Sequence, residues 1–78
     1  MSAAPQDASQ RLHDMVSGWA IKRLDHMRQG NEDTARQIGN WLFGVQMTAA
    51  TLGLIDLAAQ ASEAQYAKPA ADTAQAQP

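Results

Sequence analysis

The apolar stretch from Ile38 to Ala61 constrains the fold of this 78-residue chain more than any other feature. It reads IGNWLFGVQMTAATLGLIDLAAQA and carries a single charged residue, Asp56. No proline interrupts the stretch, and its Ala, Leu and Gln content favours helix. A helix that is apolar around most of its circumference must be buried on several sides or lie in a membrane. The sequence therefore predicts an all-α protein built around this segment.

A turn at Gly30 and Asn31 divides the predicted helices. Glycine directly after a cation-containing last turn is typical of a helix C-terminus. Asn31 is a suitable N-cap for the next helix, whose first turn is acidic. We therefore expect an antiparallel helical hairpin, with one helix over about 7–29 and a longer helix over about 32–66.

The two ends of the chain differ in composition from the predicted helices. Residues 1–6 and 67–78 consist mainly of Ala, Gln and Pro. Such segments cannot bury enough apolar surface to offset the entropy lost on ordering. We expect a flexible tail at 1–6, one helical domain over 7–66 and a disordered tail at 67–78. The first residues show no signal-peptide pattern, so the expected location is the cytoplasm.

A helical wheel separates the apolar side chains of the longer predicted helix into two stripes on nearly opposite sides. One stripe contains Ile38, Trp41, Leu42, Val45, Ala49 and Leu52. The other contains Phe43, Met47, Ala50, Leu54, Leu57 and Ala61. The first predicted helix can cover only one of these stripes, and the chain has no cysteine with which to form a disulfide. At this size a lone core supplies only roughly 3–5 kcal/mol.

We therefore expect a further body to cover the remaining stripe, which makes the protein an interaction module for a helical partner or for self-association. The candidate partner-binding residues are Trp41, Leu42, Val45, Leu52, Leu54 and Ile55. Leu52→Asp or Leu54→Asp should damage association as well as folding, because either places a charge on an apolar stripe.

Two alternatives remain open. Two hairpins could pair into a homodimeric four-helix bundle, a regulator or structural subunit, with small residues such as Gly44 and Thr48 at the seam. Residues 41–59 also have about the length of a bilayer span, roughly 20 residues. However, Gln46 and Asp56 fall inside that segment, so a single-span membrane protein is the less favoured alternative.

The sequence contains no recognisable motif for catalysis or for cofactor binding. His13 and His26 lie far apart, and no carboxylate stands at metal-ligand spacing from either. No serine has a nucleophile-elbow context, and no glycine-rich loop could cradle a phosphate. The six basic residues are spread along a chain of net charge −2, unlike a nucleic-acid interface. We therefore predict a non-enzymatic protein without cofactor, metal site, nucleic acid or small-molecule substrate.

Residues 21–60 resemble the small needle-subunit co-chaperones of bacterial type III secretion systems. The resemblance lies in the turn Met27-Arg28-Gln29-Gly30, the acidic and polar residues after it, and a longer helix that begins near Trp41 and becomes rich in Ala, Ile and Leu. Members of that family are helical hairpins that dock onto a tetratricopeptide-repeat chaperone and keep the needle subunit unpolymerised in the cytoplasm. The resemblance thus implies a secretion co-chaperone whose second helix binds a helical partner.

Overall fold

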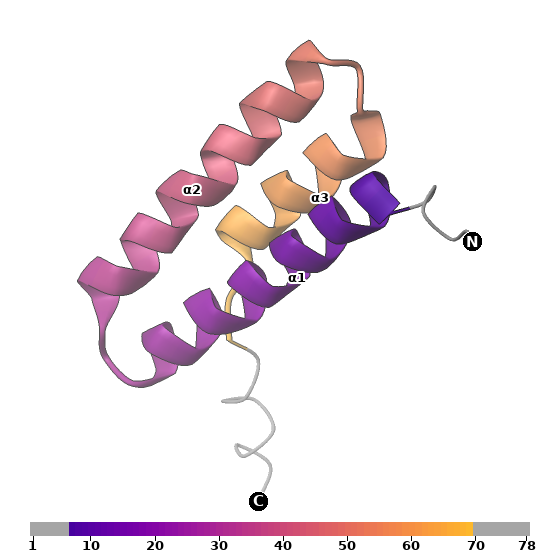
Figure 1. Cartoon of the computed structure of the whole chain (residues 1–78). Coiled ribbons are helices and arrows are strands. Elements are labelled where there is room, and N and C mark those ends of the chain that lie inside the picture. The colour runs from indigo at the N-terminus through magenta and orange to yellow at the C-terminus, as the bar shows by residue number, and fades with distance from the viewer. Residues whose placement is uncertain (1–6, 70–78) are drawn as a thin grey trace, which may run out of the picture.

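The computed structural model describes residues 7–69, which form three helices: α1 (Asp7–Arg28), α2 (Glu32–Thr51) and α3 (Ile55–Tyr66). The prediction of an all-α protein is therefore confirmed. α2 runs back alongside α1, and α3 returns along α2, so that each helix contacts the other two (Figure 1). The tail predicted at 1–6 lies outside the described residues, as do residues 70–78 of the tail predicted at 67–78. Residues 67–69 follow α3 without helical structure.

The single helix predicted over 32–66 is wrong, because the chain turns at Gly53. Gly53 has a φ of 80°, in the left-handed region that residues with a Cβ rarely adopt. Its N–H donates to the Ala50 carbonyl at 3.1 Å, and the Leu54 N–H donates to the Ala49 carbonyl at 2.8 Å. This pair of hydrogen bonds forms a Schellman motif, which ends α2 and redirects the backbone.

The connection between α1 and α2 has the same geometry at Gly30, whose φ is 83°. The Gly30 N–H donates to the Met27 carbonyl at 3.1 Å, and the Asn31 N–H donates to the His26 carbonyl at 2.8 Å. The predicted side-chain N-cap at Asn31 is wrong, since its side chain makes no capping hydrogen bond to α2. The Asn31 amide instead contacts the side chains of His26 and Gln29.

The turn at Gly53 allows α3 to bury its apolar side chains. A continuous helix over 32–66 would be about 52 Å long, whereas the 22 residues of α1 reach only about 33 Å. The last part of such a helix would extend beyond any neighbour in the same chain. Folding back places α3 against the other two helices, and all three helices contribute to one core. The core residues are Val16, Ile38, Leu42, Ala49, Leu57, Ala61 and Ala64.

Gln60 connects α3 to α1 through polar contacts. Its side-chain amide donates to the backbone carbonyl of His13 at 3.1 Å and to the hydroxyl of Ser17 at 3.0 Å. Its side-chain oxygen contacts Nδ1 of the His13 ring. The sequence favours a solvated surface position for His13, but the structure makes it part of the interface between α1 and α3.

Two further polar contacts hold the C-terminal end of α3. Gln65 is buried, and its amide donates to the side-chain oxygen of Gln46 on α2. The guanidinium of Arg23 on α1 donates to the carbonyls of Ala64 at 3.2 Å and Ala67 at 2.8 Å. The last carbonyls of a helix have no partner within the helix. Arg23 therefore satisfies two backbone acceptors and ties the end of α3 to α1.

The turn also explains the position of Asp56. In a continuous helix Asp56 would share an apolar stripe with Ile38 and Ala49, where an unpaired carboxylate is costly to bury. The break at Gly53 resets the helical phase, and Asp56 is exposed in the first turn of α3. A negative charge is favourable there because of the helix dipole.

Candidate functional site

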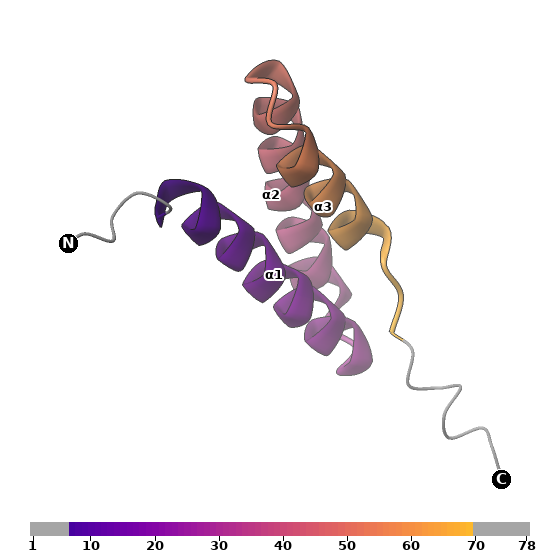
Figure 2. The ribbon, with the colours of Figure 1, turned by 90° about the vertical axis from the view of Figure 1, so that its right-hand side faces the viewer.

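An apolar groove lies where the N-terminal half of α1 diverges from the C-terminal half of α2. Figure 2 shows α1 inclined to α2. The groove has a volume of about 370 Å³, and all three helices and the turn between α2 and α3 contribute to its lining. Its large lining side chains are Leu12, Trp19, Trp41, Val45, Leu52, Leu54 and Leu57. Its small lining residues are Gly44, Thr48 and Ala49, all on α2, and none of the ten carries a charge.

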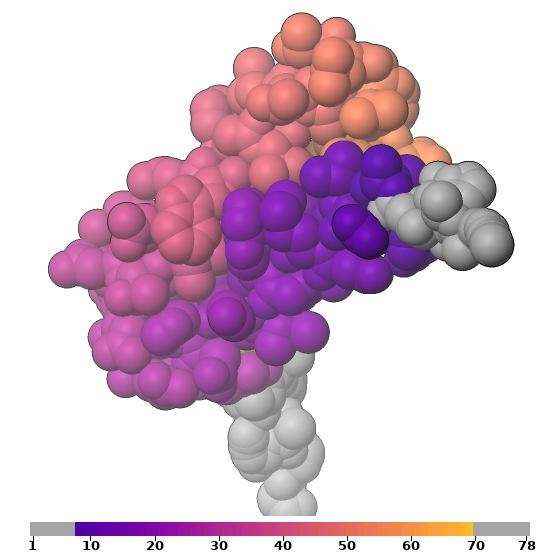
Figure 3. All heavy atoms as spheres, viewed as in Figure 1, coloured from indigo at the N-terminus to yellow at the C-terminus, as the bar shows by residue number. Residues whose placement is uncertain are grey.

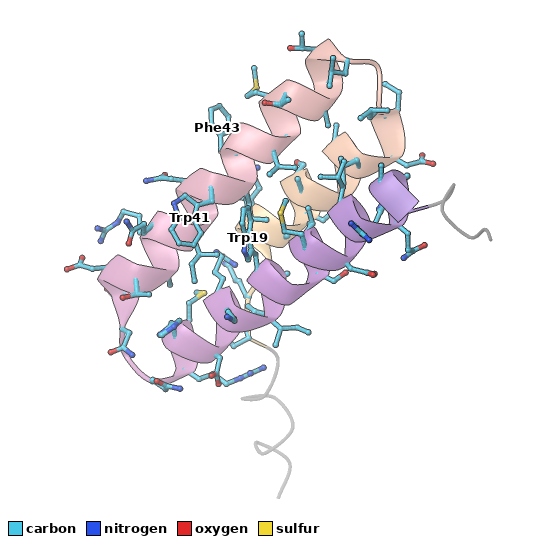
Figure 4. The ribbon with its side chains drawn as sticks, viewed as in Figure 1. Trp19, Trp41 and Phe43 are labelled. Carbon is cyan, nitrogen blue, oxygen red and sulfur yellow. The ribbon has the colours of Figure 1, made fainter. Side chains whose placement is uncertain are left out.

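Two tryptophans lie side by side at one end of the groove. The ring centroids of Trp19 and Trp41 are 5.4 Å apart, and the ring planes are inclined by 51°. Figure 4 shows Trp41 extending from α2 toward α1, where Trp19 lies. Trp19 is half-buried, whereas 48% of Trp41 is exposed. The two are the only tryptophans of the chain, so its tryptophan fluorescence reports directly on the groove.

The groove brings together most of the residues predicted to bind a partner. The four that line it are Trp41, Val45, Leu52 and Leu54. Leu42 is fully buried in the core and offers no surface to a partner in this structure. Ile55 is largely exposed at the start of α3, next to the groove but outside its lining.

Sequence reasoning missed Leu12 and Leu57 as lining residues of the groove. They belong to different helices, and the backbone turn at Gly53 brings α3 back beside α1. A signal for this turn was present, because glycine followed by an apolar residue is the usual end of a Schellman motif. Gly44 and Thr48 were weighed as packing residues, and the structure places both in the groove.

A second apolar surface lies on the opposite side of α2. Phe43 and Met47 are each about half exposed, at 50% and 49%. Figure 4 shows Phe43 extending outward from α2 on the side away from the two tryptophans, and it borders a cleft that Gln65 and Tyr66 of α3 also line. The sequence predicts that a second body must pack on the longer helix, and α3 of the same chain packs there. Neither α1 nor α3 covers the surface around Phe43 and Met47.

A larger cleft of about 600 Å³ lies toward the N-terminal end of α2 and is more polar than the groove. Its lining includes Arg23, Glu32 and Arg36. Both cations already have partners, since Arg23 donates to carbonyls at the end of α3 and Arg36 pairs with Asp33 at 3.0 Å. The groove, whose lining is uncharged and apolar, is therefore the better candidate site of the two.

The membrane alternative does not fit the helices that the structure describes. The turn at Leu52–Leu54 interrupts the segment 41–59. Among residues 7–69, no helix combines the length and the apolarity that a bilayer crossing requires. Within the same residues, no three side chains of His, Asp or Glu lie close enough together to bind a metal ion.

Comparisons with known proteins provide no relative for this chain. No protein-family model, curated protein or solved structure matches it significantly. A functional assignment must therefore rest on the shape and chemistry of the groove.

Proposed function

We propose that this protein is a non-enzymatic interaction module that binds an amphipathic helix of a larger protein in the apolar groove. The observation that supports this proposal most strongly is the uncharged lining, to which all three helices contribute. Large side chains such as Trp41 and Leu52 alternate with the small residues Gly44 and Ala49. Small residues let another backbone approach closely, and amphipathic helices bind such grooves through regularly spaced apolar side chains.

The surface around the groove favours a protein partner over a small molecule. Leu52 in the lining and Ile55 beside it are about two-thirds exposed, at 67% and 68%, so that Ile55 extends the apolar surface past the end of the groove. Figure 3 shows that the C-terminal end of α2 and the following turn project beyond α1. Apart from the indole N–H groups of Trp19 and Trp41, Thr48 has the only polar side-chain group of the lining, whereas small-molecule sites combine apolar walls with several placed polar groups. Contiguous exposed apolar surface of this kind is typical of protein interaction sites.

The resemblance to needle-subunit co-chaperones gives this proposal a more specific form. In that form the partner is a tetratricopeptide-repeat chaperone, and the complex keeps a needle subunit unpolymerised in the cytoplasm of a bacterium. This role stays a prediction, and the genes beside this one in the source genome test it. If those genes encode a needle subunit and a repeat chaperone, their protein products can be purified and tested as candidate partners. A candidate chaperone that fails to bind would contradict the secretion role and leave the groove proposal standing.

Leu52→Asp is expected to weaken binding of a purified helical partner by roughly 10- to 100-fold, because it buries a charge in an apolar contact. Binding would be measured as the change in tryptophan fluorescence when the partner covers Trp19 and Trp41. The sequence alone predicts damage to folding as well, but 67% of Leu52 is exposed in the structure, so circular dichroism should show an intact fold. Ile21→Asp is the matched control, because Ile21 is also 67% exposed but lies on α1 outside the groove lining.

The two variants together decide the proposal. Loss of binding in Leu52→Asp with full binding in Ile21→Asp supports the groove as the docking site. Equal affinities in both variants and the unchanged protein, or equal losses in both variants, would contradict it. Light scattering on the chain alone tests the homodimer alternative. A stable dimer that Leu52→Asp dissociates would identify the groove's occupant as a second copy instead of a different protein.

A further inference from the structure

The turn at Leu52–Leu54 connects α3 to the rest of the protein through a single left-handed residue, Gly53. We propose that this turn is a hinge through which two copies of the protein exchange α3. In the exchanged dimer, α3 of each copy packs on α1 and α2 of the other. This exchange is independent of the docking function, because it requires no molecule other than a second copy.

The hinge has two accessible backbone conformations. Glycine adopts left-handed and right-handed helical values almost equally readily. In the closed monomer Gly53 is left-handed, and the Leu54 N–H bonds back to Ala49. With Gly53 in the helical conformation, and with the ψ of Leu54 moved from 77° to a helical value, α2 and α3 would join into one continuous helix. The residues on both sides favour that outcome, since Ala, Leu and Gln dominate and no proline intervenes.

An open chain leaves a vacant surface that is complementary to α3. Releasing α3 uncovers core side chains such as Val16 and Leu42, together with the polar partners of Gln60. Those partners, the carbonyl of His13 and the hydroxyl of Ser17, are on α1 and can accept the same bonds from another chain. No other segment described in the structure carries this combination of groups.

The end of α3 has equally specific partners on the other two helices. Gln65 bonds to Gln46 of α2, and Arg23 of α1 donates to the carbonyls of Ala64 and Ala67. All these contacts form again in an exchanged dimer with the same donors and acceptors. The closed and exchanged forms therefore differ mainly in the conformation of the turn and in the entropy of association.

Gly53→Ala tests the hinge in the full chain. Alanine disfavours the left-handed turn and favours helix. The two effects together raise the equilibrium constant between the closed and the open hinge by roughly 100-fold per chain. Because a dimer contains two hinges, its association constant should rise by roughly 10⁴-fold. We expect light scattering to show a helical dimer at concentrations where the unchanged protein is a monomer.

Gly44→Ala is the matched control. A Cβ at Gly44 or at Gly53 meets no heavy atom within 4 Å, so neither substitution acts through crowding. Of these two glycines only Gly53 has a positive φ, whereas Gly44 lies inside α2. Gly44→Ala should therefore remain monomeric. Gly53→Asn should stay closer to the monomer than Gly53→Ala, because asparagine tolerates the left-handed conformation better than alanine does.

Cross-linking between chains identifies the exchanged contact. The chain has no cysteine, so Ser17→Cys and Gln60→Cys can each be introduced separately into the Gly53→Ala protein. The two proteins are unfolded, mixed, refolded and treated with a short bis-maleimide. A covalent heterodimer is expected, because Ser17 of one chain would face Gln60 of the other. A monomeric Gly53→Ala protein, an unfolded one, or a dimer without this cross-link would each overturn the proposal.

Discussion

Replacing Leu57 by aspartate is expected to abolish the three-helix fold, whereas Ile55→Asp is expected to leave it intact. Only 5% of Leu57 is exposed, and its side chain belongs to the common core. An unpaired carboxylate at that position costs several kcal/mol, comparable with the roughly 3–5 kcal/mol that a core of this size supplies. Ile55 lies two residues earlier in α3 and is largely exposed. An acidic residue there also interacts favourably with the helix N-terminus.

Thermal unfolding followed by circular dichroism measures both variants. The account predicts no cooperative transition for Leu57→Asp and a transition near that of the unchanged protein for Ile55→Asp. If Leu57→Asp melts like the unchanged protein, α3 does not pack on the core in solution. If Ile55→Asp unfolds as well, the assignment of inward and outward faces of α3 is wrong.

Leu42→Ala is expected to destabilise the protein by about 2–5 kcal/mol, most of its total stability. Leu42 is fully buried, so truncation removes its transfer free energy and leaves a cavity at the centre of the core. Leu52→Ala, ten residues later, should change stability by no more than about 0.5 kcal/mol, because Leu52 is largely exposed. Equilibrium unfolding in urea gives both free energies.

This comparison separates folding from binding among the residues predicted to contact a partner. A partner should fail to bind Leu42→Ala only because the protein unfolds, whereas Leu52→Asp removes binding from a folded protein. Equal stability losses in Leu42→Ala and Leu52→Ala would contradict the burial on which this distinction depends. A helical wheel drawn through one long helix assigns the two leucines to the same apolar stripe. They differ because Leu52 lies in the turn, one residue before Gly53.

The composition and periodicity of the sequence predict the helical class and the C-terminal end of α1 to within one residue. They do not predict the end of α2. An apolar run with helix-favouring residues supports a continuous helix, and glycines at 39 and 44 do remain helical. What distinguishes Gly53 is non-local, because turning there lets Leu57, Ala61 and Ala64 reach a core formed by other helices. The helix propensity of the local sequence does not include the free energy gained by that burial.

The candidate site was predicted in part for the same reason. Trp41, Val45 and Leu52 follow from the apolar stripe of α2 alone, and the groove includes them. Leu42 was assigned to the same stripe, but its side chain is buried in the core, because α1 and α3 both approach that side of α2. The role of Gln60, whose side chain bonds to His13 and Ser17 of α1, could not be recognised from the sequence. A glutamine on an isolated helix gives no indication of its partners on other helices.

The return of α3 is the central claim, since it closes the core and completes the groove. Spin labels at Arg36→Cys and Tyr66→Cys test it most directly, because both positions line one cleft and the chain has no other cysteine. Doubly labelled protein would be diluted into unlabelled protein, and pulsed electron paramagnetic resonance would give the distance between labels. Helices packed at about 8–10 Å predict a label separation below about 25 Å. A separation near 45 Å, the span of about 30 residues of uninterrupted helix, would contradict the account.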